Sequence, residues 1–226
     1  AGGDAAAKIL HAVFAGMISW AFWHYARSFF GSRNATLLAC MLYLTPFTGI
    51  LSARAYIDHG LTFYGAVALL APWGSWLQGA FIGLAIGAKY LGGFLLIGWV
   101  TALAVTGFRP GAWRVAGAAS LVAGWWGIRN WLNTGNPVYP FGYAILGGLG
   151  WDATSAHEYG GELSIYGQVK GVMEHLAIPW LATVRDRGAL DDGSLGPLYL
   201  MLAPLLLFLI KGMRRGGEHR TLLVLT

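Results

Sequence analysis

The 226-residue chain is 56% hydrophobic and only 11% charged, whereas a soluble globular domain carries about 25% charged residues. This composition indicates a membrane protein and disfavours a soluble domain. The formal net charge is +5, but the basic residues are dispersed between apolar blocks, so we expect no nucleic-acid partner. The single cysteine, Cys40, excludes an intrachain disulfide and a cysteine-based metal site.

Apolar blocks recur along the chain, and a membrane helix needs about 20 largely apolar residues, with a lower limit of about 17. The blocks predict an all-α fold: a polytopic transmembrane helical bundle with about seven membrane segments, forming one transmembrane domain over residues 1–226. The predicted segments are 9–25, 34–51, 61–76, 77–88, 91–106, 115–131 and 195–210. The fourth is too short to cross alone, so it either borrows flanking residues or is re-entrant. Because the chain starts without Met and stops in an apolar run, we expect a piece of a longer protein.

The charges predict an orientation. If the first segment runs from outside to inside, most basic residues near segment ends become cytoplasmic, in agreement with the positive-inside rule. These are Arg27, Arg33, Arg109, Arg114, Lys211, Arg214, Arg215 and Arg220, while the short outer links keep only Arg54 and Lys89. The same orientation places most acids outside, including Asp58 and the acids between Asp152 and Asp192. Either a chemically active outer face or ordinary solvation of a long loop accounts for them.

The long outer loop is predicted at residues 133–194, and loops of this length usually carry function or their own structure. Within it, residues 166–184 have apolar positions at an approximate helical period. We therefore expect an amphipathic helix along the outer membrane interface.

Polar residues at the outer ends of segments are the candidates for chemistry, because ionisable groups at membrane depth are costly. Asp4, Lys8 and His11 share one helix face by their spacing. They form either an interfacial helix start or the polar edge of an outward-facing cavity.

The link SARAYIDHG gathers Arg54, Tyr56, Asp58 and His59. Asp58 could orient a sugar hydroxyl, bind a metal ion, or pair with Arg54 four residues earlier. We take Asp58 as the catalytic candidate, with Arg54 and His59 as substrate-binding candidates. A metal site would be better defined by three or more clustered acids and histidines, so no metal ligand is assigned and a divalent metal cofactor stays open.

Two further cations lie at outer segment ends. Lys89, in GLAIGAKYLGG, either extends its ammonium to the interface or contacts a lipid phosphate, for which a compact positive charge is well suited. Arg129 and Asn130, in GIRNWLNTGNPVYPF, offer several donors to a phosphate. The alternative for Arg129 is a charge that merely marks the end of a segment.

Known soluble-enzyme motifs are absent: we find no nucleophile elbow, phosphate-binding glycine loop, zinc helix or dinucleotide fingerprint. Gly79, Gly83 and Gly87 recur every four residues. This spacing predicts a smooth helix face for close packing against another helix.

Three stretches together resemble the GT-C superfamily of multi-span glycosyltransferases, which includes the protein O-mannosyltransferases. The first is YARSFFGSRNATLLACMLYLTPF, similar to a helix pair joined at a Phe-Gly turn. The second is AYIDHGLTFYGAVALLA, followed by GAFIGLAIGAKYLGG, and the third is WWGIRNWLNTGNPVYPF, which is similar to the bacterial RgtA-like branch. The resemblance covers nearly the whole chain.

The resemblance implies an enzyme that moves a sugar, such as a hexose or mannose, from a polyprenyl-phosphate carrier to an acceptor hydroxyl on the outer face of a bacterial inner membrane. It implies Asp58 as a second outer acid and Lys89 and Arg129 as partners of the carrier phosphate, with the family's leading catalytic acid in a loop upstream of this chain. Its partners would be the lipid-linked sugar and membrane lipid.

A membrane transporter or lipid flippase fragment is the competing hypothesis. Transporters tend to place charges near mid-membrane and to interrupt corresponding helices. Here the charges lie at segment ends, chiefly on one side, which favours an outer-face enzyme.

Overall fold

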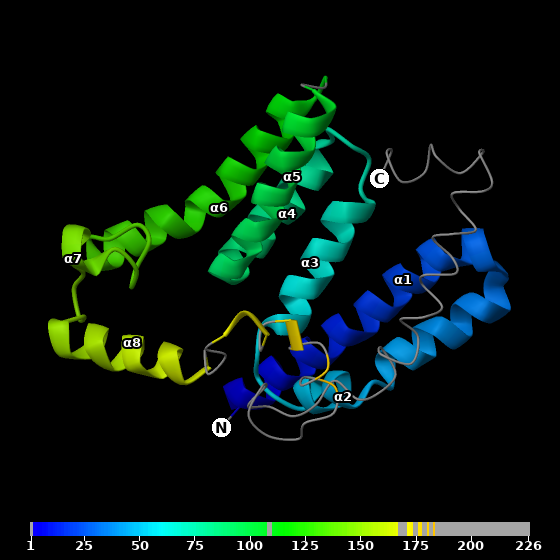
Figure 1. The fold of residues 1–226 in the computed structure, drawn as a ribbon, viewed down its shortest axis with the longest axis horizontal. Coiled ribbons are helices and arrows are strands. Elements are labelled where there is room, and N and C mark those ends of the chain that lie inside the picture. The colour runs from blue at the N-terminus through cyan, green and yellow to red at the C-terminus, as the bar shows by residue number, and fades with distance from the viewer. Residues whose placement is uncertain are drawn as a thin grey trace. The chain divides into compact units, whose positions relative to one another are not determined.

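The computed structural model describes residues 2–107, 110–166, 171–173, 176–177, 180 and 183. Their secondary structure is helical and includes no strand, which confirms the predicted all-α class for this part of the chain (Figure 1). The elements are α1 (Gly2–Tyr43), α2 (Pro46–Ser52), α3 (Asp58–Leu70), α4 (Trp76–Ala88), the 3-10 turn η1 (Tyr90–Gly92), α5 (Gly93–Thr106), α6 (Ala112–Thr134), α7 (Tyr143–Leu146) and α8 (Ala153–Tyr166).

α1 consists of two helical limbs joined at Gly31, whose φ of 73° and ψ of 161° are not helical. Glycine adopts a positive φ without the steric cost that a Cβ imposes. Trp23 Nε1–H donates to Thr36 Oγ1 at 3.1 Å, although residues this far apart in a straight helix would be separated by about 20 Å. The second limb therefore folds back along the first (Figure 1), at the boundary predicted between the first two segments.

The predicted second segment, 34–51, is not one helix. α1 ends at Tyr43, and α2 begins at Pro46. Proline has no amide hydrogen to donate and disfavours a helical conformation at the preceding residue, here Thr45. The apolar composition of this stretch concealed the break.

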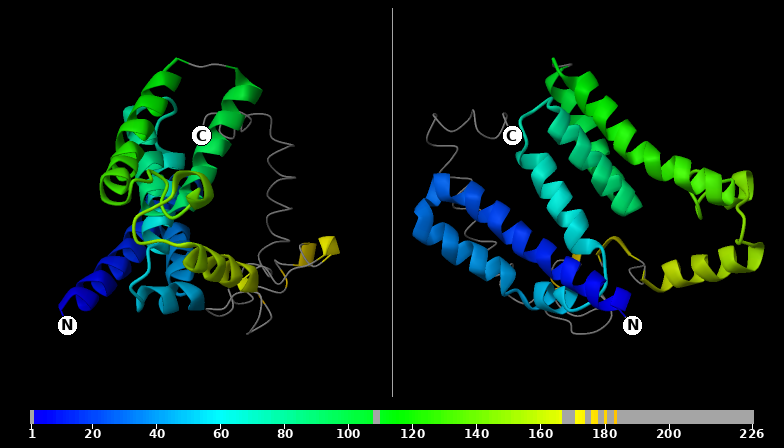
Figure 2. Two further views of the ribbon diagram at one scale, coloured as in Figure 1. Left: turned by 90° about the vertical axis from the view of Figure 1, so that its left-hand side faces the viewer. Right: turned by 180° about the vertical axis from the view of Figure 1, so that it is seen from behind.

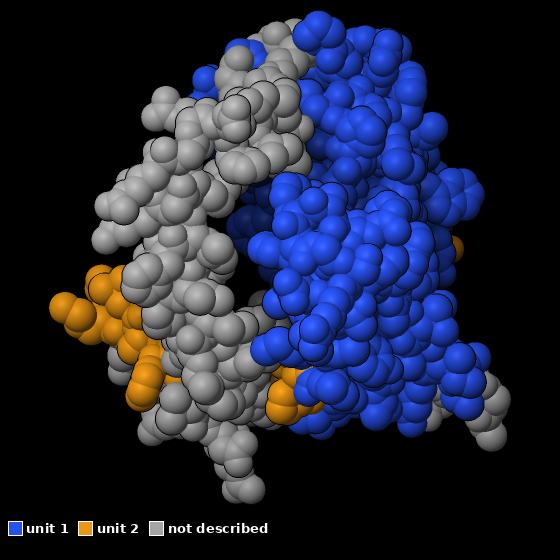
Figure 3. Space-filling model, turned by 90° about the vertical axis from the view of Figure 1, so that its right-hand side faces the viewer, with its two compact units in different colours: residues 1–44, 48–130, 225–226 blue, residues 45–47, 131–224 orange. Residues whose placement is uncertain are grey.

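The described residues fall into two compact units, coloured separately in Figure 3. The first contains residues 2–44 and the described residues of 48–130, and the second contains 45–47 and the described residues of 131–183. In the first unit, α3 packs against α1 and α4, and α4 packs against η1 and α5. Its core joins residues from α3 to α6: Ala68, Ile82, Trp99, Ala112, Val115 and Ala119.

α4 runs alongside α6 through the predicted glycine face (Figures 1 and 2). A Cβ on Gly83 would lie 2.8 Å from the Ala119 carbonyl oxygen, and a Cβ on Gly79 or Gly87 would overlap with Val115 or Trp126. The glycine spacing was therefore correctly interpreted as a close helix-packing surface. This contact aligns the last turn of α4 with the Trp126 turn of α6.

One helix among the described residues, Ala5–Tyr43, is long and apolar enough to cross a membrane by length and composition. It contains the Gly31 turn. α4 and α5 match the fourth and fifth predicted segments but have 13 and 14 residues, which rise about 20 Å at 1.5 Å per residue. α6 has 23 residues and covers the sixth segment. The predicted seventh segment, 195–210, and most of the predicted interfacial helix, 166–184, lie outside the described residues.

Candidate functional site

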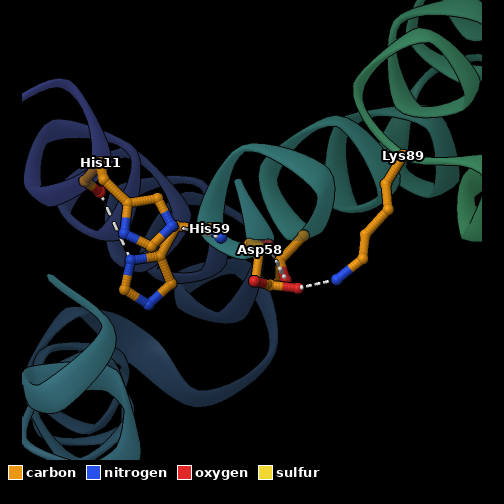
Figure 4. A network of polar contacts seen from close by, with 5 residues as sticks. His11, Asp58, His59 and Lys89 are labelled. Atoms are coloured by element: carbon orange, nitrogen blue, oxygen red, sulfur yellow. Dashed lines mark hydrogen bonds and ion pairs between the residues drawn. The ribbon is translucent and has the colours of Figure 1, made fainter. Parts of the chain in front are cut away.

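An ion pair joins Asp58, in the first turn of α3, to Lys89, at the end of α4. The Lys89 Nζ lies 2.8 Å from Asp58 Oδ1 (Figure 4). The side chains are 41% and 37% exposed, respectively, so the pair is accessible to a ligand. The structure thus brings together the catalytic candidate and one phosphate-binding candidate, which are 31 residues apart.

The chain geometry after α4 holds Lys89 in place. Lys89 has an extended backbone, with φ −156° and ψ 137°, and its amide donates to the Ala85 carbonyl at 3.1 Å. η1 follows at once, and a Cβ on Gly92 would overlap with the Ala85 carbonyl. The glycines of GAKYLGG therefore allow a tight turn between α4 and α5, and this turn leaves Lys89 at the exposed end of α4.

Arg54 does not pair with Asp58, although such a pair was one alternative predicted from their spacing. Arg54 Nη1 donates to the Tyr56 hydroxyl at 3.3 Å, and its guanidinium lies over the Tyr56 ring at 5.7 Å. A spacing of four makes two side chains neighbours when one helix runs through both residues, but α3 starts only at Asp58. Arg54 remains exposed next to the link that precedes α3.

His11 is buried, with 2% of its surface exposed, and its ring stacks on that of His59 at 4.3 Å between centroids (Figure 4). The amide of His59 donates to His11 Nε2 at 3.0 Å, so this nitrogen carries no proton. The hydrogen must then be on His11 Nδ1, which donates to the Leu51 carbonyl at 2.7 Å. His11 therefore ties α1 to the end of α2 and to the start of α3 as a neutral imidazole.

His59 lies outside the predicted membrane segments and is also buried. Burial lowers its pKa and the neighbouring His11 ring lowers it further, while the hydrogen bond to the His11 carbonyl and the charge of Asp58 act in the opposite direction. His59 Nδ1 lies 3.3 Å from the His11 carbonyl oxygen, so the hydrogen on Nδ1 points to that oxygen. The sequence identified both histidines, but nothing in it linked residues 48 positions apart.

Asn130 and Tyr90 connect α6 to the same end of α4. Asn130 Nδ2 donates to the Tyr90 hydroxyl at 3.4 Å. Burial raises the pKa of Tyr90, and the hydrogen bond from Asn130 partly offsets this rise. Because Tyr90 follows Lys89 directly, the third candidate region, around Asn130, lies beside the Asp58–Lys89 pair.

Arg129 precedes Asn130 and is exposed. Its guanidinium lies over the Trp126 ring, 5.2 Å from the centroid. Trp126 is also the residue against which Gly87 of α4 packs. This cation–π contact holds the guanidinium at the Trp126 end of α6.

Asp152, the first acid of the long outer loop, has a local structural role. Its Oδ1 accepts a hydrogen bond from the Ser155 amide at 2.7 Å at the start of α8. The hydrogen bonds from Ser155 lower the pKa of Asp152. This is the geometry of a helix N-cap. Capping of α8 and contact with solvent are therefore sufficient to account for an acid at this position.

Asp58, Lys89, Tyr90 and Asn130 meet where α3, α4 and α6 have an end in common, which we call the junction, and Arg129 precedes Asn130 in the sequence. Such a set suits a phosphate-bearing ligand with hydroxyl groups nearby. Among the described residues, no group of three or more His, Cys, Asp or Glu side chains could hold a metal ion.

Comparison with protein-family models, with curated proteins and with solved structures finds no significant match to this chain.

Proposed function

We propose that this chain is part of a multi-pass membrane glycosyltransferase that takes its sugar from a polyprenyl-phosphate carrier at the outer face of a bacterial inner membrane. The observation that carries the proposal is the junction of Asp58 and Lys89 with Tyr90 and Asn130 at one end of three helices. The resemblance of the sequence to the GT-C superfamily supports it independently.

The surface of α5 supports a membrane location. α5 contains no charged residue, and it exposes Phe94, Ile97 and Val105, the last by 81%. A helix that is apolar all round is stable when it is buried in a protein core or in lipid. The described residues do not cover these side chains, and lipid would account for their exposure.

Lys89 is suited to bind the carrier phosphate. An ammonium group has three donors, and Asp58 takes one of them at 2.8 Å. The remaining two can bind phosphate oxygens while Asp58 keeps the side chain oriented. Arg129 and Asn130 add donors from α6. Arg54 is exposed in the link before α3, and His59 is next to Asp58 in the sequence but is buried against His11.

The proposed transfer begins when an acceptor hydroxyl attacks the anomeric carbon of the sugar. The bond between that carbon and the phosphate oxygen breaks, and polyprenyl phosphate leaves with the additional negative charge. Lys89 and Arg129 stabilise this charge. A carboxylate receives the hydroxyl proton, and Asp58, whose Oδ1 accepts from Lys89, is the candidate among the described residues.

Arg129→Ala tests the proposal, and Arg114→Ala is the matched control. Both arginines are on α6 and lie over a tryptophan, at 5.2 Å from Trp126 and 5.4 Å from Trp113, but Arg114 is at the opposite end of the helix. In the full-length protein, transfer from a polyprenyl-phosphate sugar should fall by about 10²-fold or more with Arg129→Ala and stay near wild type with Arg114→Ala. Equal activity of both variants would contradict the assignment. Movement of the carrier across the bilayer without sugar transfer would favour the flippase hypothesis.

A further inference from the structure

The loop between α6 and α8 has a polar interior. Asn136 is fully buried, with 0% exposed. Its Nδ2 donates to the carbonyl oxygens of Phe141 and Gly147, both at 2.9 Å, and its Oδ1 accepts from the Val138 amide at 2.9 Å. One side chain thus satisfies three backbone groups of an irregular segment.

Other backbone donors of this loop are also satisfied within it. The Leu149 amide donates to the Thr134 carbonyl at 2.8 Å and closes the loop at its base. The Asn136 amide donates to Thr134 Oγ1 at 3.2 Å. Further amides with acceptors in this segment are those of Gly135, Tyr139, Phe141, Ile145, Leu146, Gly147 and Trp151. A loop surrounded by water would not need these internal partners, because water would provide them.

The exterior of the loop is apolar. Ile145 is 89% exposed and Leu149 77% exposed, and Val138, Phe141 and Leu146 are also exposed. Residues 131–151 include no Asp, Glu, Lys, Arg or His. Aromatic residues with polar edges lie at its base, where Trp151 contacts Tyr139 and Tyr159 edge to face at 5.7 and 5.9 Å.

We propose that residues 135–151, which we call the α7 loop, dock on the lipid bilayer and insert Ile145 and Leu149 into its hydrocarbon edge. Irregular backbone enters a nonpolar medium only when its polar groups are paired internally, and most backbone amides of this loop have such partners. The exposed aliphatic side chains suit the hydrocarbon region of a bilayer, and the Trp and Tyr residues at the base of the loop suit the headgroup region, where these residues are enriched. Protein interfaces usually have a polar rim, whereas the exposed large side chains of this loop are apolar and residues 131–151 carry no charge.

The α7 loop is distinct from the predicted interfacial helix, 166–184, and it contains none of the candidate site residues. The proposal rests on the membrane location proposed above, but it does not depend on sugar transfer. A measurement of lipid contact can therefore show that the loop proposal is wrong without contradicting the membrane location or the transferase activity.

Depth-dependent fluorescence quenching in vesicles tests the docking. Cys40 is the only cysteine, so Cys40→Ser provides a background without reactive thiols. Ile145→Cys and Leu149→Cys would each carry an environment-sensitive fluorophore in the full chain, reconstituted in phosphatidylcholine vesicles. Ile97→Cys, on exposed α5, is the control for lipid contact, and Glu158→Cys, on exposed α8, is the control for water.

Labels at Ile145 and Leu149 should emit at shorter wavelength than the label at Glu158. They should lose intensity with lipids that carry a nitroxide near the headgroup, and they should be protected from aqueous iodide. Quenching of Ile97 by nitroxide lipid without quenching of Ile145 or Leu149 would overturn the loop proposal alone. Lack of quenching at all three positions would overturn the membrane location as well. Protection of the loop labels from both quenchers would assign the surface to a protein and also overturn the proposal.

Discussion

The His11 and His59 rings stack at 4.3 Å, and the His59 amide donates to the unprotonated Nε2 of His11. The two contacts join α1 to α3 across 48 residues of sequence. A proton on either ring would place a positive charge in a buried stack, and a proton on His11 Nε2 would also remove the acceptor of the His59 amide.

This arrangement predicts that acid destabilises the first unit. The pKa of His59 is lowered in the folded protein by burial and by the His11 ring, while the hydrogen bond to the His11 carbonyl and the charge of Asp58, itself paired with Lys89, act in the opposite direction. The unfolded chain, with the ordinary value of 6.5, therefore binds a proton more readily than the folded protein. Stability should be constant above pH 6.5 and should fall as the pH drops below that value. Thermal unfolding in detergent at several pH values measures this, and His59→Gln should reduce the dependence.

His11→Ala should destabilise the protein more than a change at an exposed histidine of the same helix. It leaves the buried His59 amide without its acceptor, and the Leu51 carbonyl keeps only the bond from the Arg54 amide. A buried orphan costs about 1–3 kcal/mol. His24→Ala is the matched control, because His24 is exposed on α1. Chemical unfolding of both variants provides the comparison, and similar losses for the two would show that the His11 contacts contribute little.

The Asp58–Lys89 pair should matter far more for activity than for stability. Because both side chains are more than a third exposed, solvent screens their attraction, and such pairs contribute about 1 kcal/mol or less. A double-mutant cycle of Asp58→Asn and Lys89→Met should therefore give a coupling energy within that range. A coupling of about 3 kcal/mol or more would instead indicate a desolvated, structural pair.

Gly79→Ala should destabilise the packing of α4 on α6. The added Cβ would overlap with the Val115 backbone, and overpacking of this kind costs about 1–3 kcal/mol. Gly98→Ala is the control, since a Cβ there meets nothing within 4 Å and α5 is helical at this residue. It should be neutral or stabilise the helix by about 0.5–1 kcal/mol. If thermal unfolding shows equal effects, the close approach of the two helices is wrong.

Asn136→Ala should open the α7 loop without disturbing the first unit. The substitution removes the Asn136 partner of the Phe141 and Gly147 carbonyls and of the Val138 amide. Hydrogen exchange should then accelerate at residues 138–149, while exchange in α3 and α4 stays unchanged. Asn133→Ala, at an exposed position of α6, should leave exchange in the loop as in the wild type; acceleration by this control would attribute the effect to α6 instead.

Composition and local pattern alone determined the helical class and the positions of several helices. The fourth, fifth and sixth predicted segments coincide with α4, α5 and α6, because apolar runs and helical propensity act within a few turns of the chain. The glycine spacing in α4 predicted a packing face for the same reason, since it depends only on helical periodicity. The turn near Gly31 was likewise predicted, but the break at Pro46 was hidden by the apolar residues on both sides of it.

The tertiary structure decided which polar groups meet. Lys89 reaches Asp58 across 31 residues, and His11 meets Leu51 and His59 across 40 and 48 residues. These contacts depend on how α1, α3 and α4 pack. Each polar side chain has several possible partners of similar chemistry, and the local sequence does not show which of them the packing will bring close. Arg54 is an example. Its spacing from Asp58 suggested an ion pair between the two, but α3 starts only at Asp58 and the carboxylate pairs with Lys89 instead.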